Sequence, residues 1–211
     1  MSEISDYLPG RLGRNDATLE TDERADPRIV QVLLATAGLA PGVGEIDPEA
    51  SYEDCLAYCA AFEDAAAAGN AMLSANLAAL ESVETSKEIV RGVDGNQIQL
   101  YIHRPRKRGR RVPGIVHIHG GGMVLMGATD PMFVRWRGAL AELGMVVIGV
   151  EFRNGGGRLG NHPFPAGLND CASAVQWADS NRDALGISSI VISGESGGGN
   201  LSLATALKAN K

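Results

Sequence analysis

Residues 187–208 read ISSIVISGESGGGNLSLATALK, and they give the strongest indication of the fold. Its first seven residues are mostly apolar and β-branched, which is typical of a buried strand, and its last eight predict a helix. The residues between them, Gly194 to Gly198, have the pattern G-x-S-x-G. At a turn from strand to helix, this pattern lifts a serine hydroxyl to the top of a sheet. Ser196 is therefore predicted to be a nucleophile, at a helix amino terminus whose free N–H groups favour negative charge.

A second glycine motif follows an earlier apolar strand. Residues 116–122 read VHIHGGG. Backbone N–H groups in such a loop can stabilise an oxyanion, and glycine lets a substrate carbonyl approach them closely. Gly121, Gly122 and Gly197 are therefore predicted to form an oxyanion hole. The alternatives are a flexible strand-to-helix connection for the loop and a tight packing turn for Ser196, but the pairing of the two motifs favours catalysis.

The four histidines are not predicted to provide the catalytic base. His119 precedes the glycine loop and is expected to hold it by hydrogen bonds. His117 lies two residues earlier, on the same face of the strand, and is expected to be structural. His103 lies at a strand end and His162 in a loop. The spacing of these histidines gives little support for a metal site.

Residues 155–160 match the dinucleotide-binding pattern G-x-G-x-x-G. A dinucleotide site needs a helix that opens directly after the glycines. Pro163 and Pro165 block such a helix here. We therefore expect a loop near the substrate pocket and no nucleotide.

Composition restricts the classes of partner. The 211 residues carry a net charge of −6, which argues against nucleic acid or an anionic membrane. The basic run at 104–111 lacks interleaved aromatic residues and is predicted to be a solvated loop. Cys55, Cys59 and Cys171 are interpreted as small apolar residues in a reducing compartment. With no signal peptide and no apolar run of about twenty residues, we expect a cytoplasmic protein without a membrane span.

The amino-terminal third is predicted to be helical and the remainder to alternate strand with helix. Asp26-Pro27 and Asp47-Pro48 are both helix start signals, and the second helix is expected to reach about Ser82 with a break or kink at Gly69-Asn70. Asp94-Gly95 predicts a hairpin turn. The alternation that follows predicts a parallel sheet with helices on both sides.

Taken together, the motifs resemble the hormone-sensitive-lipase-like family of α/β-hydrolases. The resemblance rests on HGGGM at 119–123, GESGGGNL at 194–201, HPFP at 162–165, GVDGN at 92–96 and DPRIV at 26–30. It implies an α/β-hydrolase fold with a mostly parallel central sheet, residues 1–85 as a helical cap and residues 86–211 as the amino-terminal portion of the core. The same resemblance implies Ser196 as nucleophile and Gly121, Gly122 and Gly197 as oxyanion donors. It also implies a small-molecule ester substrate and no cofactor, and it leaves a homodimer open.

The family order of catalytic residues is serine, then acid, then histidine. The fifteen residues after Ser196 contain no His, Asp or Glu. We therefore expect the C-terminal part of the fold, with the acid and base, to be absent from this chain, and the strand at 187–193 to be an open apolar edge. The predicted function is a serine carboxylic-ester hydrolase that works through an acyl-enzyme. The alternatives are a non-catalytic, receptor-like module that binds small molecules, and an inactive fragment.

Overall fold

The computed structural model describes residues 16–36, 44–107 and 109–209. The chain divides into two compact units, Met1–Ala40 and Pro41–Lys211. The described part of the first unit holds a single turn of 3-10 helix, η1 (Leu19–Thr21), and helix α1 (Pro27–Thr36). Helix α1 begins at the proline of the predicted start signal. Gly38, where we expected it to end, lies outside the described residues.

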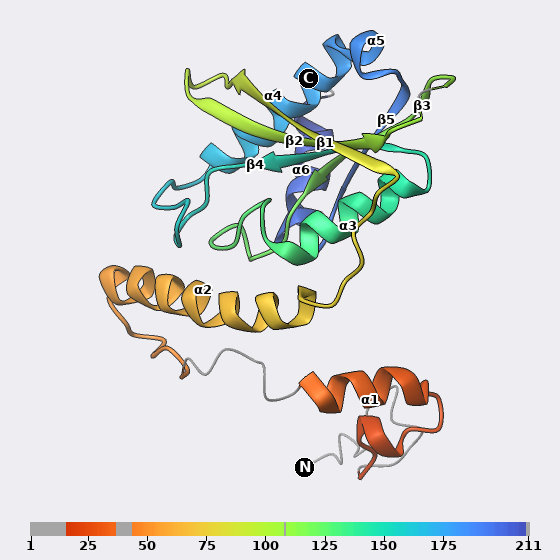
Figure 1. The fold of residues 1–211 in the computed structure, drawn as a ribbon. Coiled ribbons are helices and arrows are strands. Elements are labelled where there is room, and N and C mark those ends of the chain that lie inside the picture. Colours follow the sequence, from red (N-terminus) through yellow and green to blue (C-terminus); the bar gives the residue numbers. More distant parts are fainter. Residues whose placement is uncertain (1–15, 37–43, 108, 210–211) are drawn as a thin grey trace, which may run out of the picture. The chain divides into compact units, whose positions relative to one another are not determined.

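The second unit contains a central sheet with helices on both faces (Figure 1). In chain order its elements are α2 (Tyr52–Ser74), β1 (Val83–Arg91), β2 (Gln97–Pro105), β3 (Val112–Ile118), α3 (Pro131–Glu142), β4 (Val146–Glu151), α4 (Ala166–Ser180), α5 (Arg182–Leu185), β5 (Ile187–Gly194) and α6 (Gly197–Ala209).

The strands of the described residues are ordered β1-β2-β4-β3-β5. Strand β2 is antiparallel to both of its neighbours, whereas β3 is parallel to β4 and to β5. It follows that β2 runs against the direction that the other strands share. The sheet is therefore mostly parallel, and the predicted fold class is confirmed.

Alternation along the strands divides the sheet into two packed faces. Leu100, Val116 and Ile148 are fully buried on the face that also receives Ala174 of α4 and Leu201 of α6. On the opposite face, a second apolar cluster joins β1 and β4 to helix α3. Because helices cover both faces, β4 is apolar along nearly its whole length, as expected for a central parallel strand.

Helix α2 differs from the prediction at both ends. It begins after Ser51, whose hydroxyl accepts the N–H of Asp54 at 3.1 Å while the Asp54 carboxylate accepts the N–H of Ser51. The predicted start at Asp47 instead forms a turn, in which the Asp47 carbonyl accepts the N–H of Ala50. The helix continues through Gly69-Asn70 without a break and ends at Ser74. Reciprocal capping at Ser51 satisfies two free donors, so the helix starts there.

The predicted hairpin and edge strand are both present. Strands β1 and β2 pair across a turn in which Gly95 has a φ of 80° and the N–H of Gly92 bonds to the carbonyl of Asn96. Strand β5 lies at one edge of the described sheet, with Val191 53% exposed. Among the described helices, none combines the length and apolar character needed to cross a bilayer.

Candidate active site

Ser196 lies on a tight turn between β5 and α6. Its φ is 53°, in the left-handed region that non-glycine residues rarely adopt. The flanking glycines explain why this conformation persists. A Cβ on Gly194 or on Gly198 would lie 2.4 or 2.1 Å from the carbonyl oxygen of Ile118. The start of α6 therefore packs directly on the end of β3, and this close packing holds the serine in its strained turn.

The glycine loop that follows β3 is itself a tight turn. Gly121 and Gly122 have φ values of 106° and 65°. The carbonyl of Gly121 accepts the N–H groups of Val124 and Leu125, each at 3.0 Å. A Cβ on Gly121 would lie 2.1 Å from the carbonyl oxygen of Leu125, so only glycine fits this position.

The two glycine motifs meet in space. A Cβ built on Gly197 would lie 2.8 Å from the amide nitrogen of Met123 and 2.9 Å from that of Gly122, and one built on Gly120 would lie 3.8 Å from the Cβ of Ser196. Within the described ranges, the amides of Gly121, Gly122 and Gly197 donate to no backbone or side-chain acceptor. Free N–H groups thus lie beside the serine, which is an arrangement able to bind a negatively charged oxygen.

Glu195 ties this turn to the glycine loop. One carboxylate oxygen lies 3.1 Å from Nε2 of His117, and the other accepts the N–H of Gly120 at 3.3 Å. The His117 side chain is fully buried, and burial lowers its pKa. A neutral imidazole beside a carboxylate donates from the near nitrogen, so His117 carries its proton on Nε2. Sequence reasoning missed Glu195, although its place next to the nucleophile was a usable signal.

His119 holds the peptide group on the other side of Gly120. Its Nδ1 donates to the carbonyl of Gly120 at 2.7 Å, and its ring stacks on Phe152 with centroids 4.2 Å apart. Burial lowers the pKa of His119 to about 4, so the ring is neutral near pH 7. The predicted hydrogen bond between His119 and the loop is confirmed.

A buried arginine lies on the α3 face of the sheet below these groups. Arg137 of α3 packs on Gly149 of β4, where a Cβ would lie 2.6 Å from the arginine Nε. Its guanidinium donates to the carbonyl of Ala128, whose N–H in turn bonds to Glu151 at 2.6 Å. Burial lowers the pKa of Arg137 to about 10 and raises that of Glu151. This polar layer was not predicted from the sequence.

The segment at 155–160 lies against the glycine loop. The N–H of Gly155 donates to the carbonyl of Met123 at 2.9 Å, and the N–H of Gly156 donates to that of Val124 at 2.8 Å. No helix starts directly after these glycines; the next helix, α4, begins at Ala166. The geometry agrees with a loop near the site and not with a dinucleotide fold.

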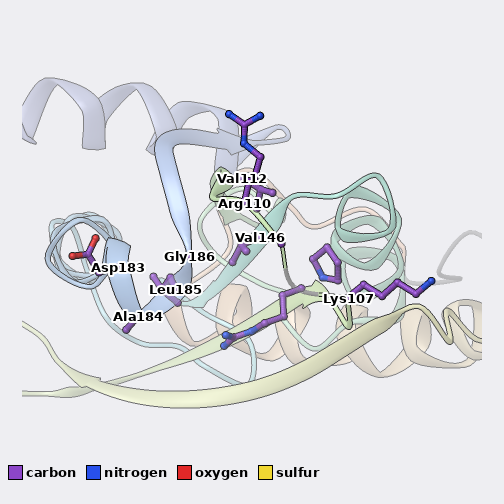
Figure 2. Close-up of a pocket in the computed structure, with 11 residues that line it drawn as sticks. Lys107, Arg110, Val112, Val146, Asp183, Ala184, Leu185 and Gly186 are labelled. Carbon is purple, nitrogen blue, oxygen red and sulfur yellow. The ribbon is translucent and has the colours of Figure 1, made fainter.

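A separate pocket of about 230 Å³ lies at the end of the sheet where β3 and β4 begin (Figure 2). Its apolar lining includes Val112 and Val146, the first residues of β3 and β4. Lys107 and Arg110 extend in different directions from it. The glycine loop follows the far end of β3, so this pocket is not part of the candidate active site. No cluster of three or more His, Cys, Asp or Glu side chains in the described ranges is arranged to hold a metal ion.

Comparison with known proteins agrees with this geometry. A family described as alpha/beta hydrolase fold matches residues 115–211, which contain both glycine motifs. The chain has the α/β-hydrolase fold. The structure of brefeldin A esterase, described as a bacterial homologue of human hormone-sensitive lipase, superposes with a TM-score of 0.80 and 40% identity. The match covers 96% of this chain and 57% of that one.

Two curated relatives, a lipase and a carboxylesterase, are similar to this chain in sequence. Mouse hormone-sensitive lipase is 33% identical over 110 residues, which are 50% of this chain and 14% of the lipase. Carboxylesterase NlhH of Mycobacterium tuberculosis is 33% identical over 116 residues, which are 53% of this chain and 34% of that enzyme. The resemblance to the hormone-sensitive-lipase-like family is confirmed. The chain spans 57% of brefeldin A esterase and smaller shares of these two enzymes.

Proposed function

We propose that this chain carries the nucleophile and the oxyanion-binding groups of a serine carboxylic-ester hydrolase. One observation supports this most strongly: Gly197 lies against the backbone of Gly122, directly beside a serine held at a φ of 53°. Ser196 is proposed as the nucleophile, and the amides of Gly121, Gly122 and Gly197 as donors to the oxyanion. The names of the relatives, which are esterases and lipases, favour the same reaction.

The proposed reaction has two halves. The Ser196 oxygen attacks the ester carbonyl carbon, and the carbonyl electron pair moves onto the oxygen that faces the glycine amides. That pair then returns, the bond to the alcohol breaks, and the alcohol leaves with the proton taken from the serine. Water attacks the resulting acyl-enzyme in the same way and releases the acid.

The proton of Ser196 needs a base. His117 and His119 are buried and bonded to Glu195 and Gly120, and His103 is buried on β2. His162 lies on an exposed loop before Ser196, whereas the family order places the histidine after the serine. We therefore propose that a histidine and its carboxylate partner come from sequence outside residues 1–211. Residues 1–85 are proposed to form a cap over a small-molecule ester, with residues 86–211 as part of the core. A cytoplasmic location and a homodimer remain predictions.

The test measures hydrolysis of p-nitrophenyl acetate by protein made from the whole reading frame. Ser196→Ala is expected to lower kcat by about 10³-fold or more. Ser180→Ala, at an exposed serine that ends α4, is the matched control and should retain the parent rate. A fluorophosphonate should label the parent protein and the control but not Ser196→Ala. If Ser196→Ala hydrolyses the ester at the parent rate, Ser196 is not the nucleophile. Ester binding without turnover would favour the receptor-like alternative.

A further inference from the structure

A buried carboxylate of helix α2 bonds to the backbone beyond the glycine loop. The Glu63 side chain is 1% exposed. Its Oε1 accepts the N–H of Met126 at 2.5 Å, and its Oε2 accepts the N–H of Arg158 at 2.7 Å and the Nε of the same arginine at 3.2 Å. One side chain therefore joins a helix to two separate loops, and Met126 lies four residues after Gly122.

The third glycine of the 155–160 segment provides room for this carboxylate. Gly157 has a φ of 62°, and a Cβ there would lie 2.5 Å from Oε1 of Glu63. Any side chain at this position would occupy the place of the carboxylate. Gly157 in this dinucleotide-like pattern thus accommodates the carboxylate of Glu63 and not a nucleotide phosphate. The glycine leaves space for the anion, and the N–H of Arg158 next to it donates a hydrogen bond.

The glycine loop needs such support because its backbone is strained. Met123 and Met126 have φ values of 66° and 72°, in addition to the two glycines between them and β3. A non-glycine residue in this region is strained and persists only where its surroundings hold it. Glu63 holds the amide of Met126, and Asn154 donates to the carbonyl of the same residue at 2.7 Å.

We propose that Glu63 is a positioning residue for the oxyanion-binding amides of Gly121 and Gly122. This inference rests on the proposed function. Helix α2 sets the end of the strained loop through Met126, and so fixes where the preceding amides point. A second contact, from the Tyr52 hydroxyl to Asn161 at 2.6 Å, ties the same helix to the end of the 155–160 segment. A shift of α2 would therefore be transmitted to the oxyanion site.

The test compares Glu63→Gln with Asp64→Asn in the protein made from its whole reading frame. A glutamine oxygen can accept only one of the two N–H groups, and its NH₂ would face the other donor. Glu63→Gln should lower kcat by about 10- to 100-fold with KM changed less than about threefold, because the amides bind charge that develops only in the transition state. Asp64 is exposed on the same helix, so Asp64→Asn should keep the parent values.

Hydrogen exchange at the Met126 amide reports on the link without any need for activity. Exchange should accelerate in Glu63→Gln and in Gly157→Ala. Gly157→Ala keeps the charge of Glu63 but displaces its carboxylate, so it tests the link if Glu63→Gln does not fold. A folded Glu63→Gln with parent kcat, or one that loses thermal stability alone, overturns the proposal. Parent activity in Ser196→Ala would instead refute the proposed function, and with it the catalytic role of Glu63.

Discussion

Gly198→Ala should lower both stability and activity, because the start of α6 has no room for a side chain. The added Cβ would lie 2.1 Å from the carbonyl oxygen of Ile118 and 2.5 Å from that of His119, whereas ordinary contact begins at 3.4 Å. Both obstacles are backbone, so α6 and the end of β3 must separate by about 1.3 Å. We expect a loss of about 3 kcal/mol in the free energy of unfolding, at the upper end for overpacking.

The same displacement should reduce activity, because it moves Ser196 relative to the glycine loop. A misplacement of about 1 Å can cost about 100-fold in rate. The assay is kcat/KM for p-nitrophenyl acetate together with urea unfolding. Gly199→Ala is the matched control: its Cβ would lie 3.2 Å from the carbonyl oxygen of Gly194, so activity should stay within about threefold of the parent. Equal activity of Gly198→Ala and Gly199→Ala would contradict this prediction.

Two further predictions concern the groups that hold Gly120. Glu195→Ala removes both hydrogen bonds of a carboxylate that is 44% exposed and should lower kcat about tenfold. Glu195→Gln should keep most of the parent rate, because His117 can change tautomer and accept a hydrogen bond from the glutamine NH₂. Equal rates for the two variants would contradict this prediction. Burial lowers the pKa of His119 from 6.5 to about 4, so the unfolded chain binds more protons in this window and stability falls as pH falls. Burial also lowers the pKa of His103 to about 4, so the parent protein should lose stability through both groups between pH 7 and pH 5. Urea unfolding of His119→Gln should lose about 2 kcal/mol less over this range than the parent, and equal losses in the two proteins would contradict the prediction.

The elements with local signals could be predicted from the sequence. The turn at Ser196, the glycine loop and the Asp94-Gly95 hairpin each depend on residues close together in the chain, where backbone preferences decide the conformation. The start of α2 was misassigned because Asp47-Pro48 and Ser51 compete as helix starts. Only Ser51 has a partner three residues later that caps it in return.

The supporting charges could not be predicted in the same way, because their partners are remote. Glu63 bonds to residues 126 and 158, and Arg137 packs on Gly149 of another element. A weak signal existed nonetheless. Glu63 lies four residues after Cys59, and Arg137 four residues after Phe133, so each charge falls on the apolar face of its helix. A charged residue at such a position is rarely buried without a partner.

The contacts around Gly120 limit which amides can serve the proposed reaction. Its N–H is occupied by Glu195 and its carbonyl by the Nδ1 of His119. The N–H of Gly120 therefore cannot serve a substrate without breaking its bond to Glu195, and the bond from His119 to the Gly120 carbonyl fixes the direction of the Gly121 N–H, which belongs to the same peptide group. The amides of Gly121 and Gly122, which come next in the loop, can donate to a substrate oxygen without first breaking a hydrogen bond. Because Glu63 fixes the far end of the same loop, both ends are held before any substrate binds, which is what preorganised stabilisation of an oxyanion requires.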